Sequence, residues 1–111
     1  MMTTDNTPKV LEFQDADRMA QTFKALADVS RLRLLSILLQ GEACVSDLAE
    51  ATSNSQSAVS HQLKSLREMN FVSTRRVGKQ IYYRIDDDHI QDLFTRALEH
   101  GRHLNPEKGQ N

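Results

Sequence analysis

The sequence predicts a small, mainly α-helical domain with one β-hairpin, its elements following the order ααααββα. Apolar residues recur at helical spacing in four successive segments up to residue 69, and again after residue 88. Between these segments, two short runs rich in β-branched and aromatic residues flank Gly78 and Lys79, which is typical of a hairpin. The length of 111 residues suits one domain, and a core this small would gain from association with a second copy.

The first two helices are predicted from their apolar positions and their ends. The first covers residues 14–26, and its apolar positions are Met19, Ala20, Phe23 and Leu26. The second can be capped by Asp28 or Ser30 and stops at Gly41. Its apolar residues are Leu32, Leu35, Ile37, Leu38 and Leu39.

A short third helix and a longer fourth helix follow, joined by a polar turn. The third covers about residues 45–52, with Val45, Leu48 and Ala49 on one face. Asn54 and Ser55 form the turn and offer N-cap chemistry. The fourth helix covers residues 56–69, and its predicted core residues are Val59, Leu63 and Leu66.

The last helix is predicted over roughly residues 88–103, because the run Asp86–Asp88 supplies an N-cap and an acidic first turn. We therefore expect a domain over residues 14–103, a flexible arm over residues 1–13 and a disordered tail over residues 104–111. Residues 1–17 are polar and acidic, which predicts no signal peptide, and no apolar run approaches the ~20 residues that span a bilayer. A single cysteine, Cys44, fits a cytoplasmic protein.

The third and fourth helices have the helix-turn-helix arrangement, in which the second helix enters a DNA major groove. Polar residues in the first half of that helix can reach base edges or phosphates; they are Gln56, Ser57, Ser60, His61 and Lys64. The hairpin then forms a wing, with Arg75, Arg76 and Lys79 near its tip facing backbone phosphates. The pattern thus predicts a winged helix-turn-helix protein that binds double-stranded operator DNA.

The distribution of charge supports a nucleic-acid partner although the whole chain has a net charge of only −1. Residues 61–84 hold six basic residues against Glu68, a net charge of +5, whereas residues 1–60 and 85–103 each sum to −3. Taken singly, these features also fit a solvated polar helix followed by an ordinary charged hairpin. Together and in this order they favour a DNA-binding surface.

A second constellation lies in the last helix and has the pattern D-x-H-x10-H-x2-H. Its members are Asp87, His89, His100 and His103. His100 and His103 share a helix face, and His89 lies eleven residues before His100, which returns almost to that face. Eleven residues also span about 16 Å along a helix axis. One zinc ion, with ligands at ~2.0–2.2 Å, therefore cannot join both ends of one helix.

A two-fold axis removes this difficulty, because both ligand pairs are centred on residues 94–95. Two last helices pairing antiparallel would bring Asp87 and His89 of one subunit to His100 and His103 of its partner. The expected seam of this homodimer is formed by Leu93, Phe94, Ala97 and Leu98. One carboxylate and three imidazoles suit Zn(II), with Co(II) as a surrogate. Alternatively, Asp87 is only an N-cap and the histidines are cations near the helix end.

These residues resemble the ArsR/SmtB family of metal-sensing repressors. The resemblance covers about residues 16–103 and depends on LADVSRLRLLSIL, GEACVSDLAEA, SNSQSAVSHQLKSLREMNFV, RRVGKQIYYRI and the terminal D-x-H-x10-H-x2-H. It implies a dimeric winged-helix repressor of genes for metal efflux or sequestration, released from its operator when metal binds. By resemblance, Asp87, His89, His100 and His103 match the family's last-helix zinc site.

One departure concerns the third helix, where family members that sense soft metals carry a Cys-x-Cys pair. Here the segment reads Cys44-Val45-Ser46-Asp47, and the first 43 residues contain neither Cys nor His. Arsenic, cadmium or lead sensing is therefore not expected. We interpret Cys44 as a small buried residue.

An enzyme is not expected, because GxGxxG, P-loop, GxSxG and CxxC motifs are all missing from the sequence. Nor do we expect a small-molecule substrate or a membrane partner. Three other classes remain open. One is a winged-helix repressor with a non-metal inducer or with Cys44 as a redox switch. The second is a zinc hydrolase, which would need an open coordination position and a general base. The third is a dimer in which zinc is only structural.

Overall fold

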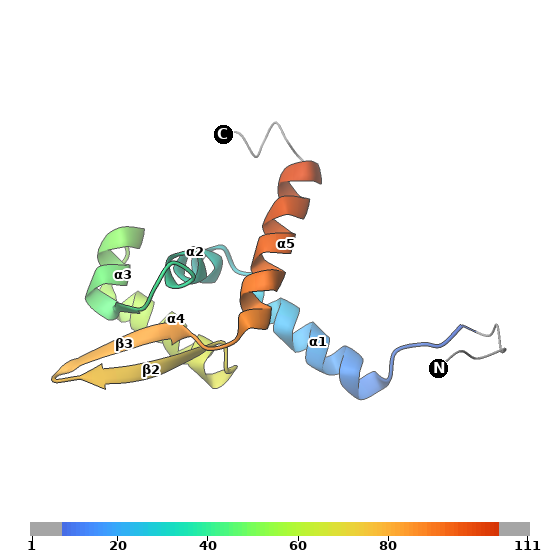
Figure 1. The fold of residues 1–111 in the computed structure, drawn as a ribbon, viewed down its shortest axis with the longest axis horizontal. Coiled ribbons are helices and arrows are strands. Elements are labelled where there is room, and N and C mark those ends of the chain that lie inside the picture. Colours follow the sequence, from blue (N-terminus) through green and yellow to red (C-terminus); the bar gives the residue numbers. More distant parts are fainter. Residues whose placement is uncertain (1–7, 105–111) are drawn as a thin grey trace.

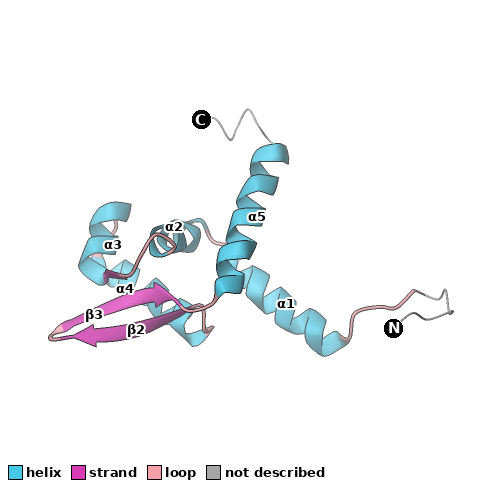
Figure 2. Ribbon diagram, in the orientation of Figure 1, coloured by secondary structure: helices cyan, strands magenta, loops and turns pink. Residues whose placement is uncertain are grey.

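The computed structural model describes residues 8–104, which form five helices and three strands (Figure 1). In chain order these elements are α1 (Phe13–Leu26), α2 (Val29–Leu38), β1 (Ala43–Cys44), α3 (Val45–Thr52), α4 (Gln56–Glu68), β2 (Val72–Val77), β3 (Gln80–Ile85) and α5 (Asp88–Leu104). The predicted winged helix-turn-helix fold is confirmed (Figure 2). The short strand β1 is an addition that the apolar pattern did not predict.

The hydrophobic core lies where α2, α3 and α4 meet the base of the sheet. Its buried residues are Ala25, Leu34, Leu35, Leu38, Ala43, Leu48, Ala49, Val59, Leu63, Leu66, Phe71, Val72 and Ile90. All three core residues predicted for α4 are therefore confirmed. On α2 the prediction was partly wrong, because Leu34 is buried whereas Leu32 is 36% exposed. The helix turns a slightly different face to the core than the apolar stripe indicated.

The sheet is antiparallel with the strand order β1-β3-β2, so β3 lies in the middle. Pairing of Ala43 with Tyr83 and of Thr74 with the same Tyr83 aligns the three strands. Because side chains alternate between the two faces of a strand, one face packs on the core and the other faces outward. Gly78 closes the wing with φ of 62°, a left-handed conformation that glycine adopts without a Cβ clash.

The orientation of α4 is set by local hydrogen bonds in the turn that precedes it. Ser53 adopts the left-handed conformation, and the amide of Asn54 donates to the carbonyl of Ala49 at 3.0 Å, which closes α3. Ser55 then caps α4, since its hydroxyl accepts from the amide of Ala58 at 3.1 Å. Ser55 is therefore the N-cap of α4, in the polar turn where the sequence predicted one.

Like α5, the first helix, α1, packs little within one chain. Ala25 is its one buried residue, and Phe23 on its predicted apolar stripe is 50% exposed. Figure 1 shows α1 and α5 projecting from the body formed by α2, α3 and α4, with the wing on the opposite side. No helix in the described part of the chain is long and apolar enough to cross a membrane.

The predicted domain ends stay predictions. Residues 8–12 of the predicted arm have no regular secondary structure and are exposed, whereas Phe13 already belongs to α1. Residues 1–7 of the arm lie outside the described residues. The predicted tail lies outside them as well, apart from Leu104, with which α5 ends.

The cap of α4 generates a prediction about stability. Ser55→Ala should lower the free energy of unfolding by about 1 kcal/mol, because the Ala58 amide loses its partner at a helix end. Ser57→Ala is the matched control, since it removes a hydroxyl from the exposed first turn of α4 and not from its cap. Urea denaturation of both variants measures the difference; equal losses would contradict the assigned cap.

Candidate functional site

The recognition surface is formed by the first half of α4. The five polar residues predicted to face DNA are all exposed: Gln56, Ser57, Ser60, His61 and Lys64. The opposite side of the same helix is buried through Val59, Leu63 and Leu66. Because these apolar residues recur at helical spacing and bind α4 to the core, the polar residues between them must point outward.

The wing presents its cations in two different ways. Arg76 lies opposite Ile81 in the ladder and Lys79 lies in the turn, and both are exposed. Arg75 instead forms an ion pair with Glu42, donating from Nη2 to Oε1 and from Nε to Oε2, the latter at 3.3 Å. Its guanidinium carbon also lies 6.0 Å from the ring centroid of Tyr82. One of the three predicted wing contacts is therefore already engaged within the chain.

Glu42 was not predicted to belong to the site. It precedes β1 and lies 33 residues from Arg75, so no local pattern relates the two residues. The pKa of Glu42 is lowered, mainly because its carboxylate accepts a hydrogen bond from Arg75, and Arg84 adds a favourable charge. Glu42 is therefore an ionised partner of the wing at neutral pH.

The first half of the predicted metal set lies at the start of α5. The Oδ1 atom of Asp87 accepts from the backbone amide of His89 at 2.8 Å and lies 2.8 Å from Nδ1 of the same residue. The His89 side chain is 95% exposed. One carboxylate oxygen and one imidazole nitrogen thus lie side by side at a solvent-accessible position.

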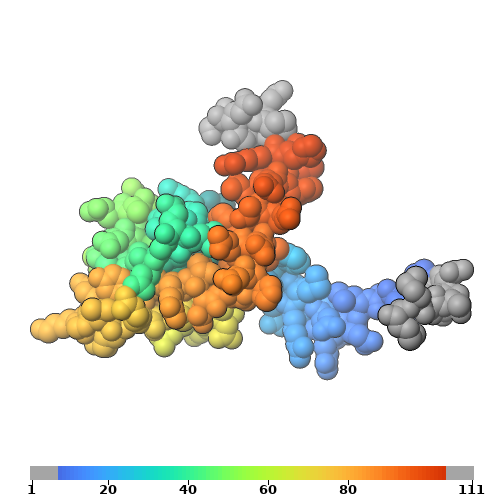
Figure 3. All heavy atoms as spheres, in the orientation of Figure 1, coloured from blue at the N-terminus to red at the C-terminus, as the bar shows by residue number. Residues whose placement is uncertain are grey.

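The second half of the set, His100 and His103, lies exposed in the last turns of the same helix. Within the described residues of one chain, no group of three or more His, Cys, Asp or Glu side chains could hold a metal ion. The two halves do not meet, because α5 is a continuous helix of 17 residues. Figure 3 shows its C-terminal part extending beyond the body of the molecule. The donor types of these four residues fit zinc, but within one chain they lie as two separate pairs.

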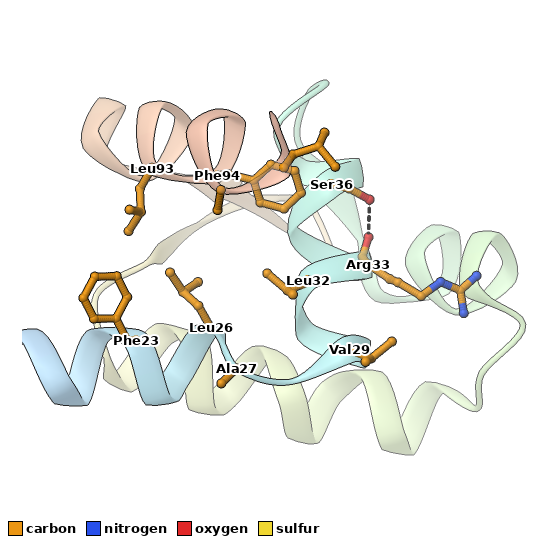
Figure 4. A pocket seen from close by; sticks show the side chains of 11 residues that line it. Phe23, Leu26, Ala27, Val29, Leu32, Arg33, Ser36, Leu93 and Phe94 are labelled. Carbon is orange, nitrogen blue, oxygen red and sulfur yellow. Dashed lines mark hydrogen bonds between the residues drawn. The ribbon is translucent and has the colours of Figure 1, made fainter. Parts of the chain in front are cut away.

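An apolar groove lies between α5 and the first two helices, with a volume of about 480 Å³. On the α5 side it is lined by all four predicted seam residues, Leu93, Phe94, Ala97 and Leu98. The other side comes from α1 and α2, where Phe23, Leu26 and Leu32 point toward α5 (Figure 4). The sequence indicated an apolar stripe on α1, but only the fold places it beside that of α5.

The single cysteine is not part of this surface. Cys44 is 7% exposed, and its Sγ lies 3.2 Å from Oγ of Ser46. The interpretation of Cys44 as a small buried residue is confirmed.

A winged helix-turn-helix domain with an exposed polar recognition helix and a basic wing defines a DNA-binding transcription regulator. Residues 28–74 match the family described as bacterial regulatory protein, arsR family. The chain is also 48% identical over 93 residues to a transcriptional repressor SmtB homolog of Synechocystis sp., covering 84% of this chain and 70% of that protein. The chain therefore belongs to the arsR family of bacterial transcription regulators.

Two further likenesses concern metal and self-association. The chain is 36% identical over 97 residues to a cadmium resistance transcriptional regulatory protein CadC homolog of Staphylococcus aureus, covering 86% of this chain and 80% of that protein. It also superposes with a TM-score of 0.75 and 32% identity on the homodimeric winged helix-turn-helix DNA-binding domain of a possible ArsR-family regulator from Mycobacterium bovis. That match covers 91% of this chain and 96% of the other.

The groove generates a prediction about self-association. Leu98 lines the groove and is 43% exposed, so Leu98→Lys should weaken dimerisation by about tenfold or more by placing an ammonium in an apolar seam. Val77→Lys is the matched control, since it changes an exposed apolar residue on the wing. Sedimentation equilibrium measures both; a Leu98→Lys protein as dimeric as the control would exclude this groove as the interface.

Proposed function

We propose that this protein is a zinc-responsive repressor that binds operator DNA as a homodimer, releases it when zinc binds, and so controls genes for metal efflux or sequestration. Membership of the arsR family and the exposed recognition helix support the DNA-binding part of this proposal. The observation that carries the metal part is the division of the ligand set between the two ends of α5.

The division of the ligands favours a site shared by two chains. Asp87 and His89 lie together at one end of α5, and His100 and His103 lie one turn apart at the other. The apolar residues of α5 that line the groove lie between these two ends. An antiparallel pair of α5 helices that contact each other through these apolar residues would complete two equivalent sites, each with residues from both subunits.

The donor chemistry favours zinc over softer ions. Each shared site would offer one carboxylate oxygen and three imidazole nitrogens, a set that suits tetrahedral zinc and in which Co(II) can serve as a surrogate. Although one relative carries the name of a cadmium resistance regulator, this chain has a single cysteine, which is buried away from α5. A thiolate-rich site of the kind that cadmium prefers is therefore not proposed.

The link between α5 and the DNA-binding surface is short. Asp87 follows β3 by two residues, so the start of α5 is joined directly to the wing. Ile90, one turn further, is buried in the core that also holds α4. When bound, zinc supplies a cross-link between the two subunits at this point. We infer that the cross-link changes the separation of the two recognition helices, which must match DNA half-sites about one turn apart.

A redox switch at Cys44 is the weaker alternative. A reactive thiol is normally accessible and lies in an electropositive setting, whereas Cys44 is buried against Ser46. Oxidation as the primary signal is therefore not favoured by this geometry.

The zinc response generates the first functional prediction. His100→Ala should leave operator affinity intact and abolish release by zinc, because one imidazole ligand is lost from each shared site. Titration of zinc into the protein–operator complex, followed by fluorescence anisotropy, measures this loss. Release of His100→Ala by zinc at the wild-type concentration would contradict the assignment, and wild-type protein that binds zinc yet stays on DNA would show a purely structural metal.

His61 provides a control for this experiment, because it lies on α4 and outside the proposed ligand set. His61→Ala protein without DNA should bind zinc with the wild-type stoichiometry of about two ions per dimer, as measured by competition with a chelator. His100→Ala should not. If both variants lost zinc equally, binding would not depend on the α5 set.

Mixed dimers test whether each site is shared between subunits. One chain carries Asp87→Ala with His89→Ala, and the other carries His100→Ala with His103→Ala; each homodimer should bind no zinc. The mixed dimer should recover one site, because the intact half of each chain can meet the other across the two-fold axis. A mixed dimer that binds no zinc would overturn the shared site. That result is expected if each site lay within one chain, because both chains then carry a destroyed site.

A further inference from the structure

The outward face of the sheet carries an ion-pair arrangement that the proposed function does not use. Arg75 and Tyr82 are direct partners in the β2–β3 ladder, and Tyr82 pairs with Cys44 of β1 on its other side. Glu42 lies two residues before Cys44, so strand alternation places it on the same face. Arg75 therefore reaches across the middle strand, over the ring of Tyr82, to the carboxylate of Glu42.

This pairing occupies the guanidinium in the way that DNA would. Two nitrogens of Arg75 donate to the two oxygens of Glu42, a bidentate geometry that arginine also uses for phosphate. Arg84 lies near enough to lower the pKa of the same carboxylate further, which keeps it ionised. A phosphate would therefore have to displace an existing anionic partner in order to bind Arg75.

Displacement would also leave an unfavourable arrangement. If Arg75 turned to a phosphate, the Glu42 carboxylate would lose its bidentate partner next to a strongly negative DNA backbone. Arg76 and Lys79 carry no such cost, because no ion pair involves either residue within residues 8–104. Both lie at or beside the turn of the wing and are exposed.

We propose that Glu42 is a positioning residue that holds Arg75 on the sheet and away from DNA, so that Arg76 and Lys79 carry the phosphate contacts of the wing. Glu42 thereby limits the sequence-independent affinity of the protein. This inference rests on the proposed DNA binding and refines it, since it removes one arginine from the predicted contact set.

The salt dependence of DNA binding tests the proposal, because each phosphate contact contributes about 0.9 to the slope of log K against log salt concentration. A random-sequence DNA duplex is the probe, and the full-length dimer is used. Arg76→Gln should lower the slope by about 2 for the two subunits, whereas Arg75→Gln should leave it unchanged. Glu42→Gln should steepen the slope by up to about 2 and tighten binding at low salt.

The double variant separates release of Arg75 from a general change in charge. Glu42→Gln combined with Arg75→Gln should return to the wild-type slope, because no arginine remains to be released. Glu50→Gln is the matched control: it removes one exposed carboxylate from α3, beside the recognition helix, without freeing a cation. Circular dichroism of every variant checks that the fold is retained.

Several results would overturn the proposal. A slope lowered as much by Arg75→Gln as by Arg76→Gln would show that Arg75 contacts phosphate and that Glu42 only orients it. Equal effects of Glu42→Gln and Glu50→Gln, or a gain that persists in the double variant, would show a general charge effect. If the wild-type protein showed no salt-dependent DNA binding, the proposed function itself would be overturned. The results for the Arg75 and Glu42 variants would overturn only the positioning role of Glu42.

Discussion

The length and rigidity of α5 constrain the proposed metal site and the dimer alike. A helix of 17 residues cannot fold back on itself, so Asp87 with His89 and His100 with His103 stay apart within one chain. The proposed zinc site would therefore need a second copy, and the apolar residues of α5 between the two pairs offer a surface for it. Helix α1 also packs little within one chain, and its exposed Phe23 lines the apolar groove beside α5.

The DNA-binding surface depends on a different balance, between the local packing of α4 and the charges around it. Burial of Val59, Leu63 and Leu66 sets which side of α4 faces outward, and the Ser55 cap sets where the helix begins. Charge is distributed less simply. The net charge of +5 over residues 61–84 overstates the free positive charge of the wing, because Glu42 from outside that segment neutralises Arg75. What a charged residue can bind depends on its position along the chain and on the residue with which it pairs in space.

Much of the fold could be predicted because most elements are marked by local patterns. The C-terminal end of α3 and the start of α4 follow from a polar turn with a capping serine, and the hairpin follows from two β-branched runs around Gly78. The strand β1 has two residues, too few for any periodicity, and exists only because β3 pairs with it. On α2, the burial of Leu34 in place of Leu32 depends on the angle at which the helix meets its neighbours. The sequence pattern of the helix does not specify that angle.

By itself, the sequence determined the order of the five helices and the hairpin, and the residue types and spacing of the proposed ligands along α5. These are local properties, since helical rise and residue type fix where each donor lies on its own helix. The tertiary structure alone decided that Arg75 pairs with Glu42 and that Phe23 and Leu26 face the apolar residues of α5. Each of these contacts joins segments far apart in the chain. They arise from packing the core and pairing the strands, and so no window of sequence could show them.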